Sequence, residues 1–121
     1  MPKLSRRTSS FKDIENLSEQ VVDAISLIRR KEDFALFLGD LLTQTEKAML
    51  GKRILIALFL QKDYSYAEIG RWLKVSQATV GAVSEKLKQG GKGYKLVIKR
   101  LEHQKKMDEM FEEIKSDLNE S

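Results

Sequence analysis

The stretch SYAEIGRWLKVSQATVGAV, residues Ser65 to Val83, decides the fold. Its apolar residues recur at the spacing of two short helices joined by a tight turn. We expect the first helix over about Tyr66 to Leu73 and the second from a cap at Ser76 to about Gln89. The inward-facing residues of this pair are predicted to be Ile69, Leu73, Val75, Val80, Val83 and Leu87. The sequence therefore predicts a helix-turn-helix over residues 65–88.

Local signals agree with this helix pair. Ser65 and Glu68 have the S-x-x-E spacing of a capping box, in which each side chain satisfies the other's backbone N–H. Ser76 is a residue type that caps helix N-termini. Lys74 occupies a turn position that glycine usually holds, so we expect a left-handed backbone there.

The outward face of the second predicted helix suits duplex DNA, because a helix fits the major groove with its N-terminal residues near base edges. Gln77 can pair with adenine through two hydrogen bonds, and the methyl groups of Ala78 and Thr79 can touch a thymine methyl. Gly81 lies inside the second predicted helix, where glycine lowers helix stability. Either a glycine is needed there so that the backbone can approach DNA closely, or the fold tolerates the loss of stability. The predicted DNA-binding residues are Arg71, Lys74, Ser76, Gln77, Ala78, Thr79, Gly81, Ala82, Lys86, Lys88 and Lys92.

Helical periodicity also dominates the rest of the chain, which predicts an all-α fold. We expect helices over about Ser10 to Arg30, Lys31 to Leu42 and Thr43 to Gln61. The third is apolar all round from Ile54 onward, which is typical of a central helix. A glycine-rich stop at residues 90–93 precedes a last predicted helix from about Tyr94 to Leu118.

The first predicted helix carries an apolar stripe close to a heptad repeat, which predicts a partner helix. The second carries many apolar residues on few turns, so we expect burial on more than one side. The candidate residues for contact with a partner on these two helices are Ile14, Leu17, Val21, Ile25, Ile28, Phe34 and Phe37, and the resemblance given below implies that the partner is a second copy, in a homodimer.

Charge divides the chain into segments. Residues 47–106 carry fourteen basic and four acidic residues, and residues 107–121 carry one basic and six acidic residues. We expect a disordered basic arm over residues 1–9, a single helical domain over residues 10–106 and an acidic helical tail over residues 107–121. The basic middle would attract a polyanion such as DNA. A solvated lysine-rich face is the alternative interpretation of the same charge.

Several function classes lack support. The chain has no cysteine and one histidine, so it predicts neither a disulfide nor a thiolate or all-histidine metal site. No nucleophile is paired with a base, so we expect no enzyme and no cofactor. The longest apolar run, Ile54 to Leu60, is too short to cross a bilayer. We expect a cytoplasmic protein with no membrane partner.

The segment from Leu41 to Lys88 resembles the tryptophan repressor family. The extension GGKGYKLVIKRL, Gly90 to Leu101, resembles the YerC/YecD branch of that superfamily. The resemblance implies a helical fold in which two chains intertwine through their N-terminal helices. It also implies that the helix starting at Ser76 reads DNA. The shared residues are Leu41, Leu42, Thr43, Glu46, Leu50, Gly51, Arg53, Ala78 and Thr79.

The resemblance also implies a tryptophan pocket, which this chain retains only in part. Arg53 matches the first of two arginines that sandwich the indole ring, and Thr43 is the other candidate for a remnant effector pocket. The second arginine falls on Ala82, the small glycine beside it on Val83, and a ligand-binding serine on Lys86. Because Ala82 cannot stack on a ring and Val83 narrows the space, we expect no tryptophan response.

The sequence therefore predicts a homodimeric, sequence-specific, double-stranded DNA-binding regulator, in the first place a repressor. Two alternatives remain open. One is a helical protein-interaction module, whose acidic tail could mask the basic surface or recruit a basic partner. The other is a nucleoid-associated protein with little sequence specificity. Recovery of a two-fold related site from random duplexes distinguishes the first hypothesis from both alternatives.

Overall fold

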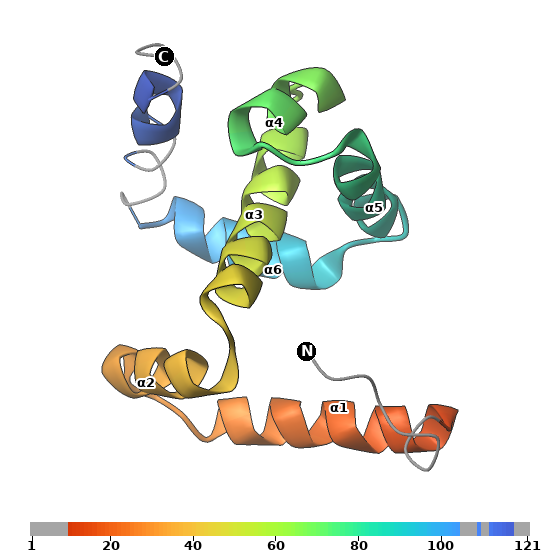
Figure 1. Ribbon diagram of the computed structural model, residues 1–121, viewed down its shortest axis with the longest axis vertical. Coiled ribbons are helices and arrows are strands. Elements are labelled where there is room, and N and C mark those ends of the chain that lie inside the picture. Colours follow the sequence, from red (N-terminus) through yellow and green to blue (C-terminus); the bar gives the residue numbers. More distant parts are fainter. Residues whose placement is uncertain (1–9, 105–108, 110–111, 118–121) are drawn as a thin grey trace. The chain divides into compact units, whose positions relative to one another are not determined.

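The computed structural model describes residues 10–104, 109 and 112–117. All regular structure in these residues is helical, which confirms the predicted all-α class (Figure 1). The elements are α1 (Phe11–Ser26), α2 (Lys31–Leu41), α3 (Gln44–Gln61), α4 (Tyr66–Leu73), α5 (Gln77–Lys88) and α6 (Lys92–Glu102), and residues 112–117 are helical as well. The predicted basic arm of residues 1–9 and most of the predicted acidic tail lie outside the described residues.

The chain forms two compact units, Met1–Gln44 and Thr45–Ser121. In the first unit, Ser10 caps α1 as expected, because its side-chain oxygen accepts a hydrogen bond from the Asp13 N–H at 3.2 Å. The helix ends four residues before the predicted Arg30. The N–H groups of Leu27 and Ile28 donate hydrogen bonds to the carbonyls three residues earlier in the chain, and this tighter pattern ends the helix.

No side chain of α1 or α2 is buried within the single chain. The apolar stripe of α1 is exposed, with Ile14 and Leu17 each 40% and Val21 46% accessible. The predicted burial of α2 on more than one side is wrong for the single chain, where Leu36 is 71% accessible. The described residues of the first unit therefore form no buried core, and the apolar stripe of α1 is exposed.

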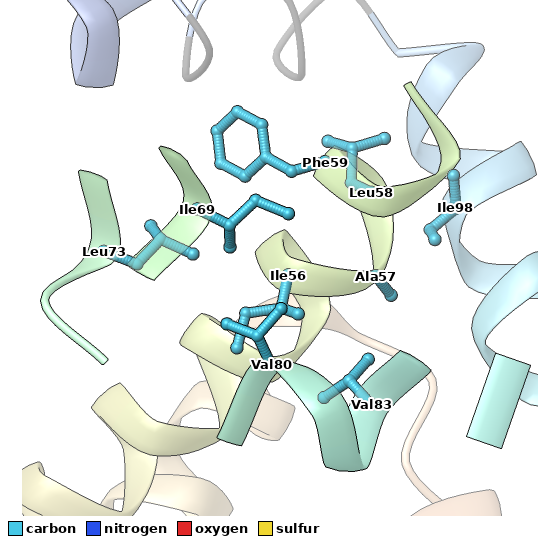
Figure 2. Packing of buried hydrophobic residues seen from close by; sticks show 9 residues of the cluster. All are labelled: Ile56, Ala57, Leu58, Phe59, Ile69, Leu73, Val80, Val83 and Ile98. Carbon is cyan, nitrogen blue, oxygen red and sulfur yellow. The ribbon is translucent and has the colours of Figure 1, made fainter. Parts of the chain in front are cut away.

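The second unit has its core around the C-terminal half of α3 (Figure 2). Ile56, Ala57, Leu58 and Phe59 are four consecutive residues with no accessible surface. Consecutive residues point in all directions around a helix, so α3 is covered on every side there. The covering residues are Ile69 and Leu73 of α4, Val80 and Val83 of α5, and Ile98 of α6. This arrangement confirms the prediction of a central helix.

The connection between α5 and α6 is sharper than expected. Gly90 and Gly91 both have positive φ angles, 122° and 56°, and α6 then begins at Lys92, inside the predicted stop. A side chain on Gly91 would place its Cβ 2.9 Å from the Leu87 Cα, so this residue must be glycine.

The prediction of one long C-terminal helix is wrong. The α6 helix ends at Glu102, and the N–H of His103 bonds back to the Leu101 carbonyl. The residues three and four positions after Leu101 are Gln104 and Lys105, so the apolar stripe that held α6 to the core is interrupted at that turn.

Candidate nucleic-acid interface

The turn between α4 and α5 has the predicted geometry. Lys74 has φ 54° and ψ 52°, which is the left-handed conformation expected for this position. The N–H groups of Lys74 and Val75 both donate to the Gly70 carbonyl, the latter at 3.1 Å. A Cβ on Gly70 would lie 3.1 Å from the Val75 carbonyl oxygen, so the turn folds back closely onto α4.

Both helices of the pair begin with the predicted caps. The Ser65 side chain accepts a hydrogen bond from the Glu68 N–H at 3.1 Å, and Glu68 accepts one from the Ser65 N–H at 3.3 Å. Ser76 accepts a hydrogen bond from the Thr79 N–H at 3.1 Å, and its Oγ lies 2.9 Å from the Thr79 Oγ1. The start of α5 is therefore fixed by its own side chains before any ligand binds.

The six residues predicted to face inward do so. Ile69 and Val80 have no accessible surface, and Leu73 and Val83 are buried. Val75 and Leu87 are partly buried and pack against the same cluster. Because these positions fix the rotation of α5, its opposite face is turned to solvent.

A hydrogen bond between Tyr66 and Ser84 also joins α4 to α5, and the sequence reasoning missed it. Ser84 is buried and lies four residues after Val80, so it sits on the inward face of its helix. A polar residue at an inward position signals that a partner is needed. Nothing in the local pattern identifies Tyr66 as that partner.

The residues predicted to read base edges share the outward face of α5. Gln77, Ala78 and Ala82 are exposed, and Thr79 and Gly81 are partly exposed. A Cβ built on Gly81 meets no atom within 4 Å, so this part of α5 presents bare backbone to solvent. We call this face, residues 77, 78, 79, 81 and 82, the reading face.

Basic residues flank both ends of α5. Arg71 and Lys74 lie at the end of α4 and in the turn, and Lys86, Lys88 and Lys92 lie at the end of α5 and the start of α6. All five are exposed. Lys88 lies 3.8 Å from Glu85, but both side chains are about two-thirds accessible, so the ion pair is weak. The predicted phosphate-binding residues are thus available at either end of the reading face.

A cavity of about 380 Å³ adjoins the reading face and is lined in part by its residues 78, 79 and 82. Among the described residues that line it, Arg53 is the one arginine, and Ala82 provides only a methyl group. Thr43, the other predicted pocket residue, belongs to the first unit. The sequence reasoning missed Tyr94, which lines this cavity; Met49, Ala78, Thr79, Val83 and Lys86 complete the lining.

A neighbouring cavity of about 610 Å³ shares Lys86 and Tyr94 with the first. Its other lining residues are largely apolar or glycine: Ile54, Gln89, Gly91, Gly93 and Val97. In the part of the chain that the structure describes, no group of three or more His, Cys, Asp or Glu side chains could hold a metal ion. None of the described helices is long and apolar enough to cross a membrane.

The comparison with known proteins identifies one family. The family model described as Trp repressor protein matches residues 16–102, which include most of α1 and all of α2 to α6. No curated protein and no solved structure matches the chain.

Proposed function

This chain belongs to the Trp repressor family, whose members are helix-turn-helix DNA-binding regulators, and we propose that it is a sequence-specific transcriptional repressor. In this proposal α5 enters the major groove of duplex DNA, with Gln77, Ala78 and Thr79 against base edges. Lys74, Lys86 and Lys88 contact phosphates on either side. The resemblance of residues 90–101 supports placing it in the YerC/YecD branch. A regulator of this kind acts where the genome is, so we place it in the cytoplasm.

The observation that carries the proposal is the orientation of α5. Val80 and Val83 are buried against α3, and this leaves Gln77 and Ala78 exposed at the first turn. Ser76 fixes that turn, so the reading face is formed before DNA arrives. A rigid helix with exposed short side chains and lysines at its ends matches what a major groove requires.

A gel-shift selection on random duplexes tests this proposal. We expect recovery of a two-fold related sequence whose half-sites are about 34 Å apart, one turn of the double helix. Binding should weaken steeply with salt, because each phosphate contact releases counterions. Recovery that is independent of sequence at every salt concentration would instead support a nucleoid-associated protein.

We further propose that the working form is a homodimer. The stripe of α1 is exposed in the single chain although it carries Ile14, Leu17 and Val21, and an apolar surface of this kind is covered in a stable protein. Charge favours a second copy as the cover, because residues 13–46 carry eight acidic and three basic residues whereas residues 47–106 are strongly basic. Ile25, Ile28, Phe34 and Phe37 complete the proposed interface.

Tryptophan is not the effector in this proposal. Arg53 lines the 380 Å³ cavity that adjoins the reading face, but this cavity has Ala82 where the resemblance requires a second arginine. Val83, 4% accessible, also occupies space that a glycine would leave open. Isothermal titration with tryptophan should show no binding at micromolar concentrations; a micromolar dissociation constant would contradict this proposal.

A further inference from the structure

The C-terminal segment, residues 112–117, contacts the connection between α3 and α4. Three aromatic residues meet at that connection, and we call Phe59, Tyr64 and Trp72 the aromatic corner. The Tyr64 ring lies edge-on to Phe59, with ring centroids 5.5 Å apart, and to Trp72, at 4.8 Å. Figure 1 shows the C-terminal segment in dark blue. The aromatic corner is therefore shared: it includes Trp72 of the helix-turn-helix, and it also forms the surface on which the C-terminal segment docks.

Two side chains anchor the C-terminal segment there. Lys115 donates a hydrogen bond from its Nζ to the Tyr64 hydroxyl oxygen at 2.7 Å, and the Nζ lies 5.1 Å from the centre of the Tyr64 ring. The hydrogen bond to Tyr64 raises the pKa of Lys115, so the ammonium form is favoured in the docked position. Ile114 packs against the hydrophobic core of the second unit. One polar and one apolar contact together define a specific position.

The docked segment carries negative charge. Glu112, Glu113 and Asp117 are exposed on it, and Lys115, the only basic residue of residues 107–121, is used as the anchor. A helical segment of six residues is about 9 Å long, since each residue adds about 1.5 Å. Its carboxylates therefore stay within roughly one Debye length, about 10 Å at 0.1 M salt, of the anchor. The anchor keeps them close to Tyr64, although they stay exposed to solvent.

We propose that the C-terminal segment is an autoinhibitory element that docks on the aromatic corner and lowers the affinity of the helix-turn-helix for DNA. This inference rests on the proposed function. Carboxylates held on the aromatic corner, to which Trp72 of α4 belongs, oppose the approach of phosphates to the basic residues of the helix-turn-helix. Docking and DNA binding then disfavour each other by the same factor. The family match ends at residue 102, so the C-terminal segment lies outside the matched residues.

Full-length variants separate this mechanism from simple charge. Lys115→Met removes a positive charge, so charge alone predicts weaker binding to DNA. Loss of the anchor predicts the opposite, an increase in affinity of about fivefold or more, the usual scale of coupling between sites. Tyr64→Phe keeps the ring in the aromatic corner, removes the hydrogen-bond acceptor and should act in the same direction. Lys99→Met, on the exposed surface of α6, is the matched control and should bind no more tightly than the parent.

The measurements are fluorescence anisotropy with a labelled duplex at low salt and the intrinsic fluorescence of Trp72, the single tryptophan of the chain. Because Trp72 contacts Tyr64, its emission should change in Lys115→Met without DNA present. A triple variant, Glu112→Gln with Glu113→Gln and Asp117→Asn, keeps the anchor and should bind DNA more tightly while leaving Trp72 emission unchanged. If the parent binds DNA but Lys115→Met binds equally or more weakly, the autoinhibitory element is refuted and the proposed function stands. Absence of DNA binding in the parent and in every variant overturns both.

Discussion

At the scale of single residues, Gly81 allows stability and DNA binding to be separated. A methyl group at this position meets no atom within 4 Å, and glycine inside a helix costs about 0.5–1 kcal/mol relative to alanine. Gly81→Ala should therefore raise the free energy of unfolding by about that amount in urea titrations. The same methyl group stands on the reading face, so DNA affinity should fall. If the variant is more stable and binds DNA as tightly as the parent, Gly81 does not contact DNA.

Replacing Gln77 and replacing Lys88 should change DNA binding in different ways. Gln77 is positioned to read a base, so Gln77→Ala should reduce discrimination at one base position by about 1–3 kcal/mol. Lys88→Ala should weaken binding to every duplex alike and lower the slope of log K against log salt by about 1. Titrations against the selected duplex and its single-base variants, at several salt concentrations, measure both effects. Equal and uniform losses in the two variants would contradict base reading by Gln77.

At the scale of elements, the cap of α5 is the feature on which the position of the reading face depends. Ser76→Ala removes the acceptor for the Thr79 N–H and should lower the free energy of unfolding by about 1 kcal/mol. Ser18 is the matched control, because its hydroxyl bonds only to the Ile14 carbonyl within α1 and caps nothing. Urea denaturation should show a lower free energy of unfolding for Ser76→Ala and almost no change for Ser18→Ala. Equal decreases in the two variants would show that the cap at Ser76 contributes nothing specific.

The elements that the sequence predicts well are those with several local signals in agreement. The bounds of α4 match the prediction because a capping box, the inward spacing and a turn all mark them. The pattern predicts too long a last helix because it spans the polar residues 102–106, where α6 ends. The bond between Lys115 and Tyr64 joins residues 51 positions apart, and that between Tyr66 and Ser84 joins residues 18 apart. Contacts of this kind depend on tertiary packing, which periodicity does not record.

The candidate site divides in the same way. The sequence identifies the reading face, since burial of the opposite face determines it. It does not identify Tyr94 as part of the cavity that adjoins that face, because Tyr94 reaches the cavity from α6, after a turn that two positive-φ glycines create. The DNA-binding role of each residue stays a prediction until the variants are measured.

At the scale of the whole molecule, the exposed stripe of α1 should determine assembly. Leu17→Asp with Val21→Asp places two charges in the stripe and should convert a dimer into a monomer in sedimentation velocity experiments. The variant should also lose most DNA affinity, because one reading face then binds one half-site alone. Glu19→Gln, also exposed on α1, is the control and should remain dimeric. A parent protein that sediments as a monomer at all concentrations would refute the homodimer.

The most direct test of the central claim, that α5 presents a preformed face to duplex DNA, is an NMR titration of the ¹⁵N-labelled chain with the selected duplex. The account predicts that the amide signals of Gln77, Ala78 and Gly81 shift most, followed by those of Lys74 and Lys88. Signals of Ile56 and Phe59 in the core should barely move. Shifts concentrated on α1 and α2, with the signals of α5 unchanged at saturation, would contradict it.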